Sequence, residues 1–195
     1  MKKLKIALLT LLAAVILLPS CKKGKDDPFI SLKSRDSRIT AKWKLTSITG
    51  TESDITISSG STTNQSKSVT YNGSTEISTT TTTITGFPTQ TNTTTSIYSY
   101  DMTIDKLGVV TYNLTAPPDS YTGNGTWVWA SNNKNKDVIN ISLNGTGGFL
   151  FSGSYDIDQL KSKELVFKNT TDEYSASSGQ NETKHTEYTY TFEKQ

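Results

Sequence analysis

The feature that most constrains the fold is an alternation of apolar and polar residues, which runs in short segments from Ile39 to the C-terminus. It is clearest on both sides of residues 105–108, where one face is apolar: Tyr98, Tyr100, Met102, Ile104, Val110, Tyr112 and Leu114. A period of two is typical of a strand that buries one face. Turn residues separate the segments and no helix-length segment lies between them, so we expect about ten antiparallel strands.

Several connections carry turn signals. Asn72-Gly73 is the strongest two-residue hairpin signal, and Gly108 suits the positive φ of a turn at 105–108. Four connections, 50–66, 86–95, 116–123 and 169–184, are predicted to be mostly long loops. Connections in a meander alternate between its two ends, so we expect the long loops at one end and the tight turns at the other. The threonines at 79–83 are either low-complexity sequence or an exposed strand, and β-branched residues favour the strand.

The predicted architecture follows from the edges of such a sheet. A meander of antiparallel strands exposes two edge strands, and closure into a barrel removes them. We therefore predict an all-β fold at 39–195, an antiparallel up-and-down meander closing into a barrel of roughly 8–10 strands. A β-sandwich is the alternative. Asp27-Pro28 carries the signal of a helix start, which predicts a short N-terminal helix before the barrel.

The N-terminus has the pattern of an export signal. Lysines within residues 1–5 precede an apolar run at 6–18, which is shorter than the roughly 20 residues of a spanning helix. The run ends at Leu18-Pro19-Ser20-Cys21, which resembles the lipobox of bacterial lipoproteins, and Cys21 is the sole cysteine. We expect a signal peptide at 1–20, a lipid on Cys21 that holds the protein to a membrane, and a tether with the short helix at 21–38. A secreted protein with a stray cysteine is the alternative.

The first predicted strand carries a second resemblance. Ile39, Ala41, Trp43 and Leu45 share one face, and residues 38–45 are similar to the Gly-x-Trp first strand of bacterial (Bacteroidetes-type) lipocalin-like lipoproteins, with Ala41 in place of the glycine. The resemblance implies a barrel whose closed end holds Trp43 under a short helix. It also implies an outer-membrane lipoprotein. Charged residues after Cys21 resemble surface-export signals, and a solvated spacer explains them equally well.

Aromatic residues gather on the predicted inward faces, and they form the candidate ligand cavity: Trp43, Tyr98, Tyr100, Tyr112, Trp127, Trp129, Tyr155, Tyr188 and Tyr190. Buried tyrosines need hydrogen-bond partners, so the interior is either a packed core or an amphipathic cavity. Two hypotheses follow. The barrel binds a small apolar or amphipathic ligand, or a glycan, at its open end, or a filled barrel displays its loops to a partner.

The composition gives no support for catalysis, a cofactor or nucleic-acid binding. Removing the three lysines of the leader from the 20 basic residues leaves 17, against 18 acidic residues. The remaining chain therefore has no excess positive charge to attract the phosphates of a nucleic acid. His185 is the sole histidine, which leaves zinc without support. Asp156 and Asp158 share a strand face and are interpreted as solubilising charges rather than a calcium or glycosidase pair. We expect a non-enzymatic protein with no metal or cofactor, whose oligomeric state stays open.

Overall fold

The computed structural model describes residues 34–130, 136–177 and 179–195, and 74% of this part is β-strand. A short helix, α2 (Arg35–Ile39), precedes eleven strands that form one antiparallel sheet. The strands are β1 (Ala41–Ser58), β2 (Ser61–Tyr71), β3 (Thr75–Ile84), β4 (Gln90–Ile97), β5 (Ser99–Ile104), β6 (Val109–Ala116), β7 (Asp119–Trp129), β8 (Val138–Leu143), β9 (Gly153–Leu160), β10 (Glu164–Ser177) and β11 (Gln180–Lys194). A 3-10 turn, η1 (Gly148–Leu150), lies between β8 and β9.

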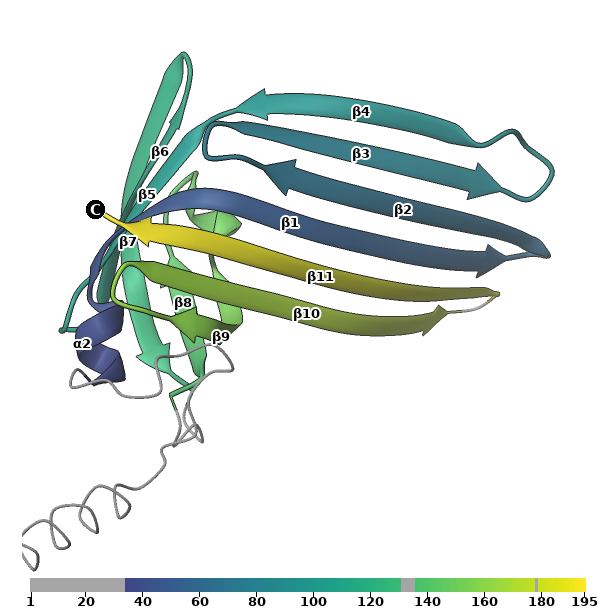
Figure 1. Ribbon diagram of the computed structural model, residues 1–195. Coiled ribbons are helices and arrows are strands. Elements are labelled where there is room, and N and C mark those ends of the chain that lie inside the picture. The colour runs from purple at the N-terminus through teal and green to yellow at the C-terminus, as the bar shows by residue number, and fades with distance from the viewer. Residues whose placement is uncertain (1–33, 131–135, 178) are drawn as a thin grey trace, which may run out of the picture.

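Eight of the strands close into a barrel (Figure 1). β1 pairs with β5, each strand from β5 to β11 pairs with the next, and β11 returns to pair with β1. Closure removes the free edges that an open meander would expose. The predicted antiparallel barrel is therefore confirmed, and the β-sandwich alternative is not the fold of this chain.

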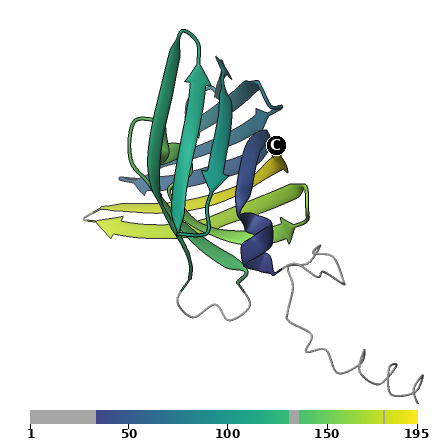
Figure 2. The same cartoon turned by 90° about the vertical axis from the view of Figure 1, so that its left-hand side faces the viewer.

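The remaining strands extend one side of the barrel into a projecting sheet, which we call the wing. It consists of β2, β3 and β4 with residues 48–58 of β1, 169–177 of β10 and 180–189 of β11. Figure 1 shows the wing extending to the right of the barrel, and Figure 2 shows β5 to β7 crossing its direction steeply. Away from the barrel, wing side chains are exposed or half-buried on both faces.

β1 changes partners at a β-bulge. Its residues 41–44 pair with β5, its pairing with β2 starts at Ile48, and its register against β11 shifts between Leu45 and Ser47. A bulge inserts one unpaired residue, bends the strand and changes which side chains face inward. As a result Trp43 and Leu45 before the bulge and Ile48 after it all lie in the core. The bulge is the point where β1 leaves the barrel and enters the wing.

Side chains fill the barrel from both ends. At one end α2 covers the interior, and the indole Nε1 of Trp43 donates to the carbonyl of Ile39 at 2.7 Å. At the other end the ring of Phe151, which follows η1, lies 4.5 Å from that of Tyr100 and 5.2 Å from that of Tyr190, centroid to centroid. Trp43, Tyr100 and Phe151 are essentially without solvent exposure. The interior is a packed aromatic core.

The predicted elements with a buried face are confirmed. Asn72-Gly73 lies in the turn between β2 and β3, and residues 105–108 connect β5 to β6. The threonines at 79–83 belong to β3, as the strand interpretation predicted. Ala41 pairs with Ile104, so the Gly108 turn lies at the beginning of β1 and the Gly60 turn lies at its far end. This places the two turns at opposite ends of the fold, as a meander requires.

The four predicted loops are wrong. Of residues 116–123, those from 119 onward belong to β7. In the other three, residues 50–66 form the β1–β2 hairpin, 86–95 contain most of β4, and 169–184 form the β10–β11 hairpin. These strands lie in the wing, where solvent reaches both faces. Ser, Thr and Asn therefore occupy both faces, and the alternation that indicates a strand is missing. Strand structure here comes from continuous backbone pairing with neighbouring strands.

A side-chain cap marks the start of the described helix, α2. Its N-cap is Ser34, whose Oγ accepts a hydrogen bond from the backbone N–H of Ser37 at 3.2 Å. Ile39, predicted as the start of the first strand, is the last helical residue, and its side chain is buried. The predicted helix start at Asp27-Pro28 and the predicted lipidation site, Cys21, lie outside the described residues.

Candidate binding site at the mouth of the barrel

The nine predicted inward aromatic residues separate into three groups. Five are buried in the core: Trp43, Tyr100, Tyr112, Trp127 and Tyr155. Trp129 lies beside α2, where its Nε1 donates to Asp36 Oδ1 at 2.6 Å. Tyr98, Tyr188 and Tyr190 are half-buried where the barrel opens onto the wing, and the candidate site is built around them.

One face of the wing continues the barrel interior, and we call it the inner face. Side chains alternate along a strand, so buried Ile48 places Gly50 and Glu52 on the inner face as well. Pairing between β1 and β11 sets Tyr188 directly opposite Gly50. A Cβ on Gly50 would lie 2.1 Å from Cδ1 of Tyr188, so the phenol ring lies across the glycine backbone. Gly50 therefore makes the space for Tyr188.

Tyr188 connects the aromatic core to a charged pair. Its hydroxyl donates to Glu52 Oε1 at 2.5 Å, and Lys67 Nζ donates to the same oxygen at 3.0 Å. Its ring stacks on Tyr190 with centroids 5.8 Å apart, and Tyr190 in turn contacts Phe151. A continuous series of contacts therefore runs from buried Phe151 to the partly exposed ion pair of Glu52 and Lys67.

A second tyrosine pair lies on β2 and at the junction of β4 with β5. The rings of Tyr71 and Tyr98 stack with centroids 4.7 Å apart, and the Tyr71 hydroxyl donates to the carbonyl of Tyr98 at 3.0 Å. The Tyr98 hydroxyl donates to Glu76 Oε2 at 2.6 Å. Each side of the mouth thus holds a stacked tyrosine pair joined to a carboxylate. We call the whole set the mouth cluster: Glu52, Lys67, Tyr71, Glu76, Tyr98, Tyr188 and Tyr190.

The two sides of the mouth cluster are close enough to affect each other's ionisation. Burial raises the pKa of Tyr190 to about 12, and the charges of Glu52 and Glu76 add to the shift. Burial also raises the pKa of Tyr98 and of Tyr188, helped in each case by the hydrogen bond to a carboxylate. Since Glu76 also contributes to the shift of Tyr188, the carboxylates and phenols share one electrostatic environment.

Glu52 is held in its ionised form. Burial alone would raise its pKa, and it is the largest single effect. The hydrogen bonds from Tyr188 and Lys67, with the charges of Lys67 and Lys184, outweigh burial and lower the pKa. The mouth therefore presents a charged acceptor, an ammonium donor and aromatic ring edges and faces within a few strands. This set suits a ligand that carries both C–H surface and hydroxyl groups.

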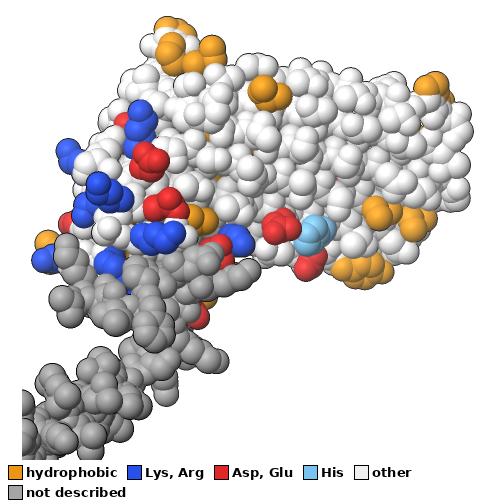
Figure 3. All heavy atoms as spheres, in the orientation of Figure 1, with side chains coloured by type: hydrophobic (Ala, Val, Ile, Leu, Met, Phe, Trp, Pro, Cys, Tyr) orange, Lys and Arg blue, Asp and Glu red, His pale blue; other side chains and the backbone are white. Residues whose placement is uncertain are grey.

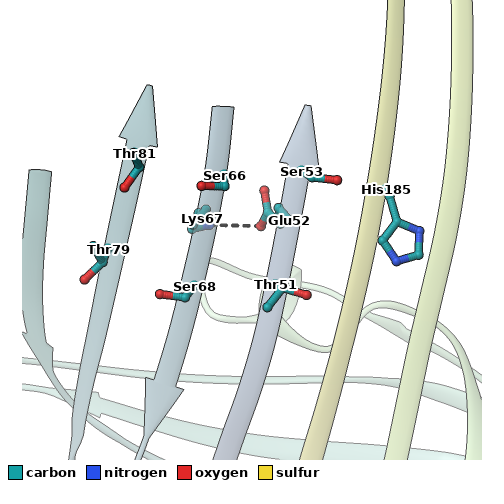
Figure 4. A pocket seen from close by; sticks show the side chains of 9 residues that line it. All are labelled: Thr51, Glu52, Ser53, Ser66, Lys67, Ser68, Thr79, Thr81 and His185. Carbon is teal, nitrogen blue, oxygen red and sulfur yellow. Dashed lines mark hydrogen bonds and ion pairs between the residues drawn. The ribbon is translucent and has the colours of Figure 1, made fainter. Parts of the chain in front are cut away.

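The outer face of the wing carries a different set of side chains. A shallow groove of about 260 Å³ lies there, lined mainly by serines and threonines of β1, β2 and β3 together with His185 (Figure 4). Glu52 and Lys67 of the mouth cluster also line it. His185 Nδ1 lies 2.6 Å from Asp172 Oδ1, and Figure 4 shows the imidazole between β11 and β10, away from the hydroxyls. Ser53 pairs with His185 across the strands, but the imidazole is turned toward Asp172. This arrangement lacks a base positioned on a nucleophile.

Several members of the mouth cluster were missed by the sequence analysis. Glu52 fell within a predicted loop, and Lys67 and Glu76 were given no role. A usable signal was present for the first of these. Ile48, Gly50 and Glu52 alternate with Thr49 and Thr51, and a glycine inside a strand pattern indicates close approach of another group.

A scan against models of known protein families finds no match, and neither does a search of curated proteins. Within the described residues, no three acidic, histidine or cysteine side chains come together as a metal site. The same part of the chain contains no helix with the length and hydropathy of a membrane span.

Proposed function

We propose that this protein is a membrane-anchored lipoprotein whose lipocalin-like barrel binds a small amphipathic ligand or a glycan at its open end. The barrel supplies a rigid scaffold, and the mouth cluster supplies the contacts. The lipobox at residues 18–21 supports the anchor, with Cys21 as the lipidated residue and the outer membrane as the location. Binding rather than catalysis is proposed, because the described polar clusters satisfy one another without an activated nucleophile.

The observation that carries the proposal is the position of Tyr188. Its ring lies half-buried over Gly50 while its hydroxyl reaches the Glu52–Lys67 pair. Pyranose rings offer C–H groups that pack on tyrosine and hydroxyls that donate to a carboxylate. A glycan is therefore the ligand class that uses most of the groups present. Because the interior is packed, the ligand is expected on the inner face of the wing and outside the barrel core.

A panel of immobilised neutral and acidic oligosaccharides tests this proposal. We expect selective retention by a subset of the panel. Glu52→Gln should weaken it about tenfold or more, since a hydrogen bond to a charged group contributes about 1.5–3 kcal/mol. Glu187→Gln is the matched control, because Glu187 is exposed on the outer face, opposite Thr51. No retention by any oligosaccharide, or equal loss in both variants, would refute a glycan site at the mouth.

The anchor has its own test. Cells that express the full chain and receive a fatty-acid probe should label the protein, and Cys21→Ala should abolish both the label and membrane association. Persistent labelling of the alanine variant would show that Cys21 is not the attachment point.

A second function, a filled barrel that displays a surface to a protein partner, is favoured by a different observation. The interior holds fully buried rings from both ends, and the wing projects beyond them as a solvated sheet. Such a protein has unpaired strand edges that a partner could bind, whereas its barrel interior is filled by side chains. The wing rather than a set of loops is then the displayed surface.

A further inference from the structure

The wing is an open sheet with two edges, and the barrel does not close them. β4 pairs with β3 alone in the described structure, over eight consecutive residue pairs from Thr75–Ile97 to Thr82–Gln90. At the other edge, strand pairing between β10 and β9 ends at Lys168, so residues 169–177 of β10 are paired as a strand with β11 alone within the same part of the chain. In an antiparallel edge strand, alternate N–H and C=O groups point outward, ready for another strand.

The two edges differ in the features that prevent strand addition. The β10 edge carries Asp172 and Glu173, and charges on an edge discourage pairing with another chain. β4 has no charge, no proline and no bulge, and all eight of its side chains are exposed. Figure 3 shows the same contrast on the face that carries His185: charged side chains gather over the barrel, and the wing is mostly uncharged. β4 is therefore the unprotected edge.

The outer side chains of β4 are already ordered by its neighbour. Thr93 Oγ1 lies 3.1 Å from Thr79 Oγ1, and Thr91 Oγ1 lies 3.3 Å from Thr81 Oγ1. The β3–β4 register has no shift, so the strand is regular from end to end. A regular edge with fixed side chains loses little conformational freedom when a further strand is added.

We propose that two copies of this chain associate through β4, which pairs antiparallel with β4 of the second copy. A two-fold axis perpendicular to the sheet keeps the outer faces of both copies on one side and requires residues of the same face to meet. Centring the pairing on Thr93 satisfies this condition. The facing residues are then Thr93 with Thr93, Thr91 with Thr95, Asn92 with Thr94, and Gln90 with Ser96.

The proposed register brings compatible side chains together. Threonine opposite threonine is a favourable cross-strand pair, and no like charges meet, because β4 has none. A two-fold contact uses the same strand on both copies, so the assembly closes at a dimer. Further growth would need the β10 edge, where Asp172 and Glu173 oppose it. The contact is small compared with the roughly 1,200–2,000 Å² of stable interfaces, so we expect a weak dimer that concentration promotes.

Cysteine cross-linking tests the register directly. The full chain carrying Cys21→Ser has no other thiol, so Thr93→Cys in that background introduces one thiol per copy. Facing residues of antiparallel strands have Cα atoms about 4.5–5.5 Å apart, within the roughly 4.4–6.8 Å of disulfides. Mild oxidation of the purified protein should give a disulfide-linked dimer on non-reducing electrophoresis. Ser175→Cys, on the β10 edge that carries Asp172 and Glu173, should remain monomeric under the same conditions.

A second variant separates pairing from random collision. Adding Thr91→Lys and Thr95→Lys to Thr93→Cys places like charges opposite one another and should reduce the yield of linked dimer about tenfold or more. Thr91, Thr93 and Thr95 are exposed, so the circular dichroism spectrum should stay that of the unmodified protein. Equal cross-linking of Thr93→Cys and Ser175→Cys, or no effect of the lysines, would overturn the proposal. Cross-linking of Thr93→Cys in cells to a protein of different mass would also overturn it and assign the edge to a foreign strand.

Discussion

Gly50→Ala tests the geometry of the mouth in its simplest form. An added Cβ would lie 2.1 Å from Cδ1 and 2.2 Å from Cε1 of Tyr188, so the ring must move. Moving it breaks the hydrogen bond to Glu52, which costs about 1.5–3 kcal/mol for a charged acceptor. Loss of the stacking on Tyr190 adds about 0.5–1.5 kcal/mol. Alanine is better than glycine in a strand by about 0.5–1 kcal/mol, which offsets part of the loss.

The net expectation is that the free energy of unfolding falls by about 1–4 kcal/mol. Urea unfolding followed by tryptophan fluorescence measures it, and Thr51→Ala on the outer face is the control, expected within about 0.5 kcal/mol of the parent. A double-mutant cycle then isolates the cause. In a Tyr188→Ala background, Gly50→Ala should stabilise the protein by about 0.5–1 kcal/mol, because the obstacle is gone. If Gly50→Ala stabilises the parent as well, the ring does not lie over the glycine and the description of the mouth is refuted.

Three further predictions follow from the described contacts. Trp43→Ala should lower the free energy of unfolding by about 3–5 kcal/mol and the melting temperature far more than Lys44→Ala, and equal melting temperatures would mean that the faces of β1 are misassigned. Burial raises the pKa of Tyr71 and Tyr190 to about 12 and also raises that of Tyr98. A phenol with a higher pKa in the folded state stabilises the fold below pH about 10 and loses that contribution as pH rises toward the folded value. The urea midpoint should therefore fall from about pH 9 to about pH 11, and less steeply in Tyr98→Phe, whereas an identical fall in both proteins would contradict it. The pKa of Glu52 is lowered, so its stabilising contribution is present above about pH 4.3 and is lost as pH falls toward the folded value. The melting temperature should therefore fall less in Glu52→Gln than in the parent as the pH is lowered below about 4.3.

The barrel could be predicted from the sequence because its strands bury one face. Tyr100, Met102, Ile104 and Val110 are buried in the structure, and their alternation with polar residues indicates both the strands and their inward faces. The same pattern located Trp43 and Leu45. Burial of one face gives a strand sequence a period of two, and this pattern indicated the strands of the barrel. Ile39 is the exception, because it is buried but belongs to α2.

The wing could not be predicted in this way, because neither of its faces forms a core. Thr51 and Glu52 are both compatible with water, so the β-structure at 50–58 depends on pairing with β2 and β11. β11 is distant in the sequence, and β2 is polar itself, so neither gives a local signal. The closure of β1 with β11 joins residues near the two ends of the folded part, and no local signal encodes it. The mouth cluster combines residues from four strands and from the junction between β4 and β5, and it emerges only once this register is known.

We propose that a ligand binds at the mouth of a filled barrel rather than inside it. Amide chemical shifts of the isotope-labelled protein, recorded during titration with an oligosaccharide retained by the array, distinguish the two positions. We expect shift changes at Gly50, Glu52, Glu76 and Tyr188, with the amides of buried Tyr100 and Leu165 unchanged. Changes concentrated at Tyr100, Tyr155 and Leu165, with the wing unaffected, would place the ligand inside the barrel and refute a site at the mouth.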